Sequence, residues 1–275
     1  MGFRARQKLG KYRLERRLAE GGFAAVYQAY DTVEGIRVAL KIPFPTQVTP
    51  ATLADFRREA RLTASLDHPN ILPIKNAALV DGHFVIALPL GQETLEDRMK
   101  RRMTAPFVLD CAEQVLEALA YAHGRRIIHC DVKPDNVIMF SGKQLRLTDF
   151  GIAKVAQRNQ PASGSGTVGY MAPEQAMGRP TFASDVFSMG LMLFRMLTGK
   201  LPEWPYRWPL VGHDKLRRKV SKEVIEVLEK SLTVDVLERY RDAGQMLSAL
   251  RRARQSRSVV RLAPPPAKSS RRRAA

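Results

Sequence analysis

The chain has 275 residues, a formal net charge of +18, 45% hydrophobic residues and 26% charged residues. These proportions predict a soluble globular protein with one large domain or two modest lobes. Its two cysteines, Cys111 and Cys130, are too few for a disulfide framework or a four-cysteine zinc site, so we expect a reduced, cytoplasmic protein. No window approaches about 18 uninterrupted apolar residues, which predicts that the chain has no transmembrane segment.

The first third of the chain has the pattern of a small sheet. Residues 12–42 alternate apolar and polar side chains around short glycine breaks, which predicts successive antiparallel strands. The next segment, "TPATLADFRREARLTASLDHPN", is helical in pattern, with Thr52 as a possible cap and Pro69 at its exit. Two further strands are expected around 71–80 and 83–90.

The pattern becomes helical from about residue 94. Apolar residues recur at helical spacing between Val108 and Ala122, and Gly124 ends that run. The short segments "NVIMF" and "LRLTDF" are expected to be strands, and further helices are expected at roughly 183–198, 221–232 and 242–254. A sheet-rich lobe and a helical lobe are thus expected to join near Leu88–Gln92, and a cleft between lobes is a natural ligand site.

Several short motifs could carry chemistry, although each is weak alone. "LAEGGFAAVY" places a glycine turn between two strands, where backbone N–H groups could cover phosphates. Lys41 ends the strand "VALK", and Glu59 lies on the following helix on the face that carries Phe56 and Ala60. A carboxylate near an apolar face needs a partner, and Lys41 is the candidate.

The order of the later motifs is far more specific. The chain reads "IIHCDVKPDN" at residues 127–136, "LTDFG" at 147–151 and "APE" at 172–174. In order and interval these segments match the His-Arg-Asp, Asp-Phe-Gly and Ala-Pro-Glu motifs of protein kinases. Over residues 12–251 the chain resembles that family. The segments "DVKPDN", "GTVGYMAPEQ" and "SDVFSMGLMLFRMLTGKLP" are similar to those of the eukaryotic-type serine/threonine kinases of bacteria.

The resemblance implies an α+β, bilobal fold and a domain plan. It implies a basic extension at 1–11 and a kinase domain at 12–251, with a small antiparallel lobe at about 12–90 and a mostly helical lobe at about 91–251. The remaining residues, 252–275, hold eight Lys or Arg and no acid, and they are expected to be disordered.

The resemblance also implies a function for named residues. We expect transfer of the γ-phosphoryl group of ATP to Ser or Thr hydroxyls of a protein substrate. Lys41, paired with Glu59, would bind the phosphates, and Asn136 and Asp149 would hold Mg²⁺ or Mn²⁺. Asp131 would accept or orient the substrate proton and Lys133 would offset charge on the γ-phosphoryl. The full set of expected ATP contacts is Leu18, Ala19, Gly21, Gly22, Val26, Ala39, Lys41, Glu59, Ala87, Leu88, Leu90, Asn136 and Asp149.

Three other positions are structural expectations from the same resemblance. Glu174 and Arg239 match a buried ion pair of the helical lobe, and Asp185 matches an aspartate that anchors the backbone of the catalytic loop. In the activation segment, Ser163 and Ser165 are possible phosphorylation sites, and Thr167 matches a residue that braces the substrate platform.

The chain departs from the family pattern at three places. Ala19 and Ala24 replace glycines of the phosphate loop, and their methyl groups restrict the approach of the backbone to phosphate. Ala87 falls at the position behind the adenine, where a small side chain would enlarge the pocket. Cys130 replaces the arginine that binds a phosphorylated activation segment, so activity is expected not to depend mainly on phosphorylation there.

Two alternatives of different kinds are open. The chain could be an ATP-binding pseudokinase scaffold, which the two alanines favour and the complete set of charged motif residues disfavours. It could also be a kinase targeted by its basic tail to an acidic partner, nucleic acid or an anionic surface. An aromatic content of 7% and the lack of a stacking-rich strand motif argue against nucleic-acid binding by the folded domain.

Overall fold

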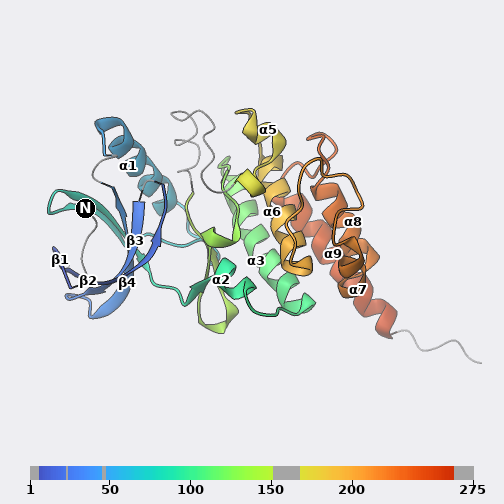
Figure 1. Ribbon diagram of the computed structural model, residues 1–275, viewed down its shortest axis with the longest axis horizontal. Helices are drawn as coiled ribbons and strands as arrows, with labels where there is room; N and C mark the ends of the chain where they lie inside the picture. The colour runs from blue at the N-terminus through green and yellow to red at the C-terminus, as the bar shows by residue number, and fades with distance from the viewer. Residues whose placement is uncertain (1–5, 23, 45–47, 151–167, 263–275) are drawn as a thin grey trace, which may run out of the picture.

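The computed structural model describes residues 6–22, 24–44, 48–150 and 168–262, except for the side chains of residues 51, 55, 59, 168 and 256–262. Figure 1 shows a small lobe built on a curled sheet beside a larger lobe built mainly from helices. The two lobes follow one another in the chain and meet near residues 89–94. This arrangement confirms the expected α+β, bilobal fold.

The small lobe is an antiparallel sheet of six strands in the order β1-β2-β3-β4-β6-β5. The successive antiparallel strands expected between residues 12 and 42 are present as the three adjacent strands β2, β3 and β4. The bounds are β1 (Lys8–Leu9), β2 (Tyr12–Glu20), β3 (Ala24–Asp31), β4 (Ile36–Pro43), β5 (Asn76–Val80) and β6 (His83–Pro89). Register shifts between Leu14 and Arg16 and between Arg17 and Ala19 interrupt the pairing of β2 with β3, and such irregularities bend and twist a sheet.

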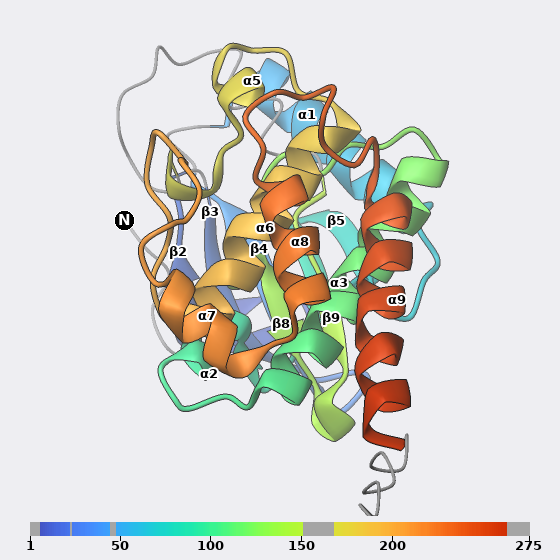
Figure 2. The ribbon, with the colours of Figure 1, turned by 90° about the vertical axis from the view of Figure 1, so that its right-hand side faces the viewer.

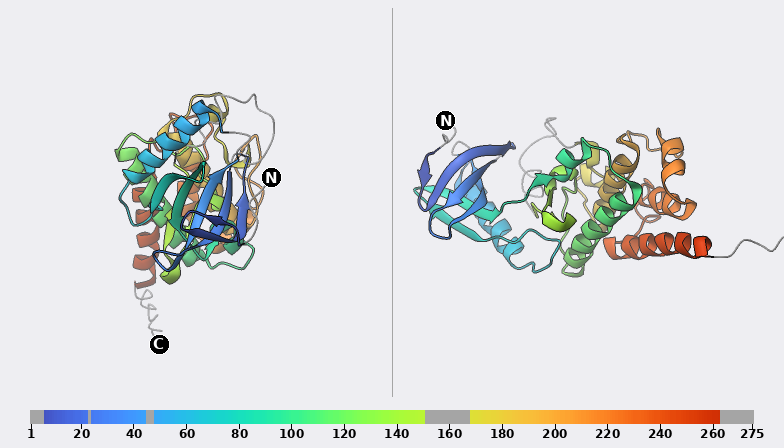
Figure 3. Two further views of the ribbon diagram at one scale, coloured as in Figure 1. Left: turned by 90° about the vertical axis from the view of Figure 1, so that its left-hand side faces the viewer. Right: turned by 90° about the horizontal axis from the view of Figure 1, so that it is seen from below.

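The two faces of this sheet bury different residues. One face holds a cluster that includes Tyr27, Val38 and Leu40, and the other holds Ala39, Ile86 and Leu88 against Phe56 and Ala60 of α1 (Pro50–Ala64). Figure 3 shows α1 lying beside the strands at a steep angle to them. The helix therefore covers the face of the sheet that carries Ala39.

The start of α1 differs from the expected one. Thr49, not Thr52, is the N-cap: its hydroxyl accepts a hydrogen bond from the Thr52 backbone N–H. The Thr52 hydroxyl accepts one in return from the Thr49 N–H at 2.8 Å, so Thr52 completes a capping box. Pro50 follows in the first helical turn, where its missing N–H costs nothing.

The segment after α1 links the two lobes by backbone pairing. A strand was expected from about residue 71, but β5 begins at Asn76, and Ile71 forms an isolated parallel bridge with Leu147 of β9 (Leu145–Leu147). The Leu72 N–H donates to the Leu147 carbonyl at 2.9 Å, and the Leu147 N–H donates to the Asn70 carbonyl at 2.8 Å. The Asn70 amide donates to the Leu145 carbonyl at 2.9 Å. The strand that leads to Asp149 is therefore held by the small lobe.

The large lobe is built around α6, whose side chains are nearly all buried. A helix that is apolar on all sides belongs in a core. A Cβ at Gly190 of α6 would collide with Ser231 Oγ, so the glycine permits the close approach of α8.

The large lobe contains seven described α-helices and a small three-stranded sheet. The helices are α2 (Leu95–Met99), α3 (Ala105–Gly124), α5 (Pro173–Ala176), α6 (Phe182–Thr198), α7 (His213–Lys219), α8 (Lys222–Ser231) and α9 (Ala243–Leu262), and the strands are β7 (Glu93–Thr94), β8 (Val137–Met139) and β9.

The last helix is longer than expected. We expected a helix to about residue 254 and a disordered tail from 252, whereas α9 continues to Leu262. Figure 2 shows α9 running alongside α3 and α8 at the end of the lobe. Ala253 is buried, and Arg254 pairs with Asp110 of α3 at 2.7 Å and with Glu113. The first part of the expected tail thus belongs to the folded lobe, and residues 263–275 lie outside the described part of the chain. Among the described helices, none is long and apolar enough to cross a membrane.

These contacts give a stability prediction for truncated chains. Removal of residues 252–275 deletes the Ala253 contact and the Arg254 ion pairs, and we expect it to lower the free energy of unfolding by about 1–2 kcal/mol. The corresponding fall in Tm is roughly 2–8 °C. Removal of residues 263–275 alone is the matched control and should leave Tm unchanged. Equal thermal melting curves for the two truncated chains would show that α9 contributes nothing beyond Arg251.

Candidate active site

The loop between α3 and β8 brings three of the expected residues together. The Asp131 carboxylate accepts a hydrogen bond from Asn136 Nδ2 at 2.8 Å and forms an ion pair with Lys133 Nζ at 2.8 Å. Asn136 Nδ2 also donates to the Asp131 backbone carbonyl at 2.8 Å. The aspartate is therefore fixed through both its main chain and its side chain.

The backbone before Asp131 is held by a buried carboxylate of α6. Asp185 accepts hydrogen bonds from the N–H groups of His129 at 2.8 Å and Cys130 at 2.9 Å. This confirms the expectation that Asp185 anchors the catalytic loop. Cys130 has φ +66°, in the left-handed region that costs an L residue other than glycine about 1–2 kcal/mol. The hydrogen bonds to Asp185 offset that cost.

His129 connects the loop to the segment that follows β9. Its Nδ1 accepts a hydrogen bond from the Asp131 N–H at 3.2 Å, so Nε2 carries the proton and donates to the Thr148 carbonyl at 2.9 Å. Its ring packs edge-on against the buried ring of Phe150, with centroids 4.6 Å apart. Asp131 and Asp149 are thereby positioned through the same imidazole.

Lys41 and Asp149 meet across the two lobes. Lys41 Nζ on β4 lies 2.7 Å from Asp149 Oδ1, and the Lys41 side chain is buried. Burial alone would raise the pKa of Asp149, but the adjacent Lys41 ammonium overcomes this and holds the pKa below its ordinary value. Asp149 is thus an anionic carboxylate with φ +66°, beside a cation and next to the catalytic loop. The expected Glu59 partner of Lys41 lies outside the described side chains.

The register of β4 with β6 corrects the expectation for Ala87. Ala39 and Lys41 of β4 pair with Leu88 and Ile86, and directly paired residues point to the same face of an antiparallel sheet. Ala87 pairs with Leu40 and belongs to the cluster on the opposite face. The β6 side chains that share the face of Lys41 are Ile86 and Leu88, so the expectation that Ala87 enlarges the pocket behind the adenine is wrong.

The other expected ATP contacts divide into two groups. Val26 pairs with Lys41 in the β3–β4 register and shares its face with Ala39, while Leu90 packs against the cluster that contains Ala39 and Leu88. Gly21 and Gly22 lie at the β2–β3 turn, and Leu18, which is exposed, and Ala19 lie near the end of β2 before it. A Cβ at Gly22 would meet nothing within 4 Å, so the described turn itself does not require that glycine.

The donor set at the loop fits a hard divalent cation. Nδ2 of Asn136 is used by Asp131, which leaves Oδ1 for a metal, and Asp149 offers carboxylate oxygen. Within the described residues no group of three or more His, Cys, Asp or Glu gathers as a metal site. Mg²⁺ is commonly bound by one or two protein oxygens together with phosphate and water, so this sparse set suits it.

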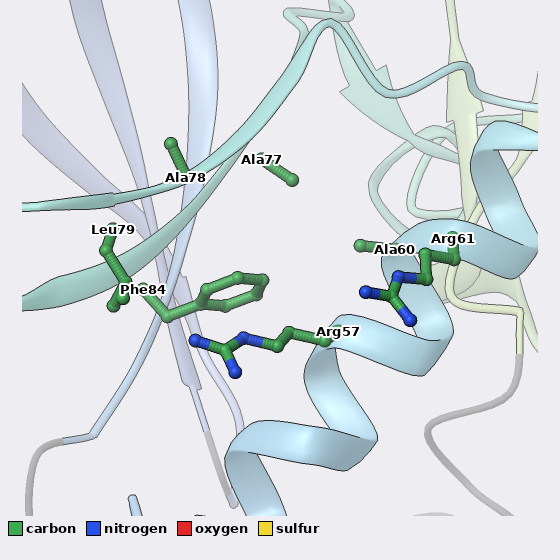
Figure 4. A pocket seen from close by; sticks show the side chains of 7 residues that line it. All are labelled: Arg57, Ala60, Arg61, Ala77, Ala78, Leu79 and Phe84. Carbon is green, nitrogen blue, oxygen red and sulfur yellow. The ribbon is translucent and has the colours of Figure 1, made fainter.

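A separate pocket lies on the outer side of α1, away from these residues. Figure 4 shows it between α1 and the strands β5 and β6, with Arg57 beside Phe84 and Arg61 further along the helix. None of the residues that we expected to bind ATP lines it. The expected activation-segment residues Ser163, Ser165 and Thr167 lie outside the described part of the chain.

The expected ion pair of the large lobe is confirmed. Both oxygens of Glu174 accept hydrogen bonds from Arg239, at 2.8 and 2.9 Å, and the Arg239 side chain is completely buried. The other donors of the guanidinium bind the carbonyls of Ala183, Thr233 and Val234. Although burial alone would raise the pKa of Glu174, its bonds to Arg239 and Ser184 hold that pKa below the ordinary value.

Two functional positions in this site were not identified from the sequence. Gln175 Nε2 donates to the Cys130 carbonyl at 2.6 Å, and His123 Nε2 donates to Asp185 at 2.9 Å. The Ala243 N–H donates to His123 Nδ1, which fixes the protonated nitrogen as Nε2. Gln175 follows "APE" directly, and that adjacency was the available signal.

Comparisons with known proteins agree with this geometry. Residues 12–249 match the protein kinase domain family. The serine/threonine-protein kinase PknA of Mycobacterium tuberculosis is 34% identical over 284 residues, covering 95% of this chain and 66% of the relative. Serine/threonine-protein kinase PrkC of Bacillus subtilis is 36% identical over 201 residues, covering 70% of this chain and 31% of the relative. The chain therefore spans less than two thirds of the length of these relatives.

The fold has a solved counterpart. The crystal structure of the PknI kinase domain of Mycobacterium tuberculosis superposes with a TM-score of 0.72 at 23% identity, and the match covers 92% of this chain and all of that one. At 23% identity this similarity supports the fold alone.

The Glu174–Arg239 pair gives a second stability prediction. Arg239→Ala leaves a buried carboxylate without its cation, and we expect it to lower the free energy of unfolding by about 3–5 kcal/mol. Arg239→Lys should also destabilise, because an ammonium cannot reproduce the bidentate, five-donor geometry. Arg241→Ala, at an exposed position, is the control.

The ion pair also predicts how stability depends on pH. Because the pKa of Glu174 is lowered in the fold, the contribution of the pair to the free energy of unfolding is fully present above the ordinary pKa of 4.5 and is lost as pH falls through the folded pKa. Denaturant unfolding at pH 7 measures the effect, and a loss below about 1 kcal/mol for Arg239→Ala would contradict it.

Proposed function

This chain belongs to the protein kinase family, and we propose that it is an active serine/threonine protein kinase that uses ATP and a divalent cation. The observation that carries the proposal is the convergence of Lys41, Asp149, Asp131 and Asn136 from three separate segments, namely β4, the residues after β9 and the loop between α3 and β8, onto one place between the lobes. The similarity to PknA and PrkC, both named serine/threonine-protein kinases, supports the choice of hydroxyl amino acids as acceptors.

Phosphoryl transfer requires positioning and charge neutralisation more than covalent help. Lys41 would bind phosphate oxygens of ATP, and Val26, Ala39 and Leu88 would pack against the adenine from the sheet. Asn136 and Asp149 would hold Mg²⁺ or Mn²⁺, which when bound neutralises charge on the phosphates. The Lys41–Asp149 contact at 2.7 Å supports this arrangement, because each group lies where a nucleotide phosphate and its cation would meet.

Asp131 is the proposed acceptor of the substrate hydroxyl proton. Its carboxylate is oriented by Asn136 and lies beside Lys133, so an incoming hydroxyl would face an ordered base next to a cation. Lys133 would then offset the charge of the γ-phosphoryl group as it transfers. A scaffold without catalysis remains the alternative, and the alanines at 19 and 24 are the feature that favours it.

The enzyme proposal predicts a sharp loss in two single variants. Asp149→Asn replaces the anionic oxygen with a neutral amide that binds a hard cation poorly, and Asp131→Asn removes the base while keeping its shape. Each should retain less than about 1% of wild-type transfer from radiolabelled ATP with magnesium, with an unchanged fold by circular dichroism. Asp135→Asn, in the same loop, is the control and should keep most of the activity. Equal labelling by wild type and Asp131→Asn would identify a scaffold.

We also propose that activity does not depend mainly on phosphorylation of the activation segment. Cys130 is buried and has neither the positive charge nor the fork of donors with which the arginine of the family motif binds a phosphate. Its backbone is held on one side by Asp185 and on the other by Gln175, and neither contact involves a phosphate. These contacts support a catalytic loop that is ordered without that switch.

This proposal predicts a small effect of removing the phosphorylation sites. Ser163→Ala combined with Ser165→Ala, or treatment of the wild type with a phosphatase, should change kcat by less than about tenfold, or 1.4 kcal/mol of barrier. Cys130→Arg should increase the dependence on phosphorylation, since it restores a cation that can bind phosphate. Steady-state kinetics of phosphorylated and dephosphorylated protein test this, and a hundredfold drop in the double alanine variant would show that another basic group binds the phosphate.

A cytoplasmic location and a partner for the basic end complete the proposal. Cys111 and Cys130 are buried and form no disulfide, and burial raises the pKa of the Cys111 thiol to about 12, as expected for an unreactive thiol in a reducing compartment. An acidic protein, nucleic acid or anionic surface is the proposed partner of the residues beyond α9. That part of the proposal is supported by charge alone.

A further inference from the structure

The main chain on the two sides of Cys130 is held by side chains from two other elements. The N–H of Cys130 donates to Asp185 of α6 at 2.9 Å, and its carbonyl accepts from Gln175 Nε2 of α5 at 2.6 Å. The carbonyl of Cys130 and the N–H of Asp131 belong to one rigid planar unit. Whatever orients that carbonyl therefore orients the start of Asp131.

Gln175 is well suited to this task because it is buried, with 2% of its surface exposed. The atom at 2.6 Å from a carbonyl oxygen must be a donor, so the amide nitrogen faces Cys130. The short helix α5 that carries it is fixed by the neighbouring Glu174, which binds Arg239 and Ser184. The amide is thus a neutral donor on a rigid support.

The geometry points to a further role for Gln175: we propose that it is a positioning residue for Asp131, which holds the Cys130–Asp131 peptide in place without any positive charge at position 130. This role rests on the proposed kinase function. Without the Gln175 bond, the buried Cys130 carbonyl would lose this donor, and the 3.2 Å bond from the Asp131 N–H to His129 Nδ1 would still bind the other end of the peptide. The peptide would then be oriented less precisely, and Asp131 with it.

Substitutions that change the hydrogen-bonding chemistry of the Gln175 amide distinguish a positioning role from a purely structural one. Gln175→Glu places a carboxylate oxygen against the Cys130 carbonyl oxygen when ionised, which removes the donor. When protonated, the carboxyl group donates to the same carbonyl and restores the bond. A buried carboxyl group without a cation partner has a raised pKa, so lowering the pH should repair this variant. Gln175→Met keeps the length of the side chain but has no donor at any pH.

The experiment compares kcat and KM for ATP across pH 6.0–8.5 in wild type, Gln175→Glu and Gln175→Met. At pH 8 we expect kcat to fall about thirtyfold in both variants, while KM for ATP stays within about threefold, because the nucleotide contacts are untouched. Toward pH 6 the ratio of Gln175→Glu to Gln175→Met should rise about tenfold. The charged and titratable groups near this peptide, His129, Asp131, Lys133, Glu174, Asp185 and Arg239, are common to both variants and cancel in the ratio.

Gln144→Glu is the matched control. Gln144 Nε2 also donates to a backbone carbonyl, that of Pro69 at 3.2 Å, but at a more exposed place away from Asp131. This variant should keep kcat within about twofold of wild type at each pH. Thermal melting of every variant reports on folding separately from kinetics.

The outcomes distinguish the positioning role from the kinase function itself. Transfer by wild type and its loss in Asp131→Asn establish the function whatever Gln175 does, and an inactive wild type would overturn both. If wild type is active, unchanged kcat in Gln175→Met, or a ratio that does not vary with pH, would overturn the positioning role. If Gln175→Glu does not fold, Gln175→Met decides by its kcat. Unfolding of both would assign Gln175 to the stability of the lobe and overturn the proposal.

Discussion

The carboxylate of Asp185 is the constraint on which the arrangement of the large lobe depends. It is completely buried in α6, and its two oxygens accept hydrogen bonds from His123, His129 and Cys130. A carboxylate buried without partners would cost several kcal/mol, so the three donors must come together if α6 is to occupy the core. His123 ends α3 and also accepts a hydrogen bond from Ala243 at the start of α9. One carboxylate therefore helps to fix the positions of α3, α6, α9 and the catalytic loop relative to one another.

The same logic extends to α5, which is too short to be stable by itself. Its four residues, Pro173–Ala176, are held from two sides by side chains that point in different directions. Glu174 is bound by the fully buried Arg239, whose donors also satisfy three backbone carbonyls near α6 and α8. Gln175 extends the opposite way to the catalytic loop. The ion pair thus stabilises the support from which a neutral amide contacts the loop.

Sequence reasoning reached the motif residues because their chemistry is specific and their order is fixed along the chain. It placed Asp131, Asn136 and Asp149 in one site, and the structure brings Asp131 and Asn136 into direct contact. It failed at Ala87 because a shift of one residue in register moves every side chain to the other face of a strand, and only the pairing of β4 with β6 fixes that register.

The end of α9 was missed for a different physical reason. Residues after Arg251 are rich in arginine and show no apolar period, so local pattern favours disorder. The helix continues because Arg254 meets Asp110 and Glu113 of α3, and these acids lie more than 100 residues earlier in the chain. Contacts of that separation leave no local signal. Thr49 was passed over as the cap of α1 for a smaller reason, since Thr49 and Thr52 have the same side chain and differ only in which lies at N-cap and which at N3.

The cysteine in the catalytic loop acquires a consistent explanation from these contacts. An arginine at position 130 would bring a charged group that needs a phosphate or a carboxylate to satisfy it, and the loop would then be ordered only when that partner is present. Cys130 is small and 4% exposed, and its main chain already has partners at both its N–H and its carbonyl. The order of the loop is therefore supported by buried hydrogen bonds to a carboxylate and an amide of the folded lobe. Such buried bonds are not changed by a phosphatase, which is the physical basis of the proposal that activity does not depend mainly on phosphorylation of the activation segment.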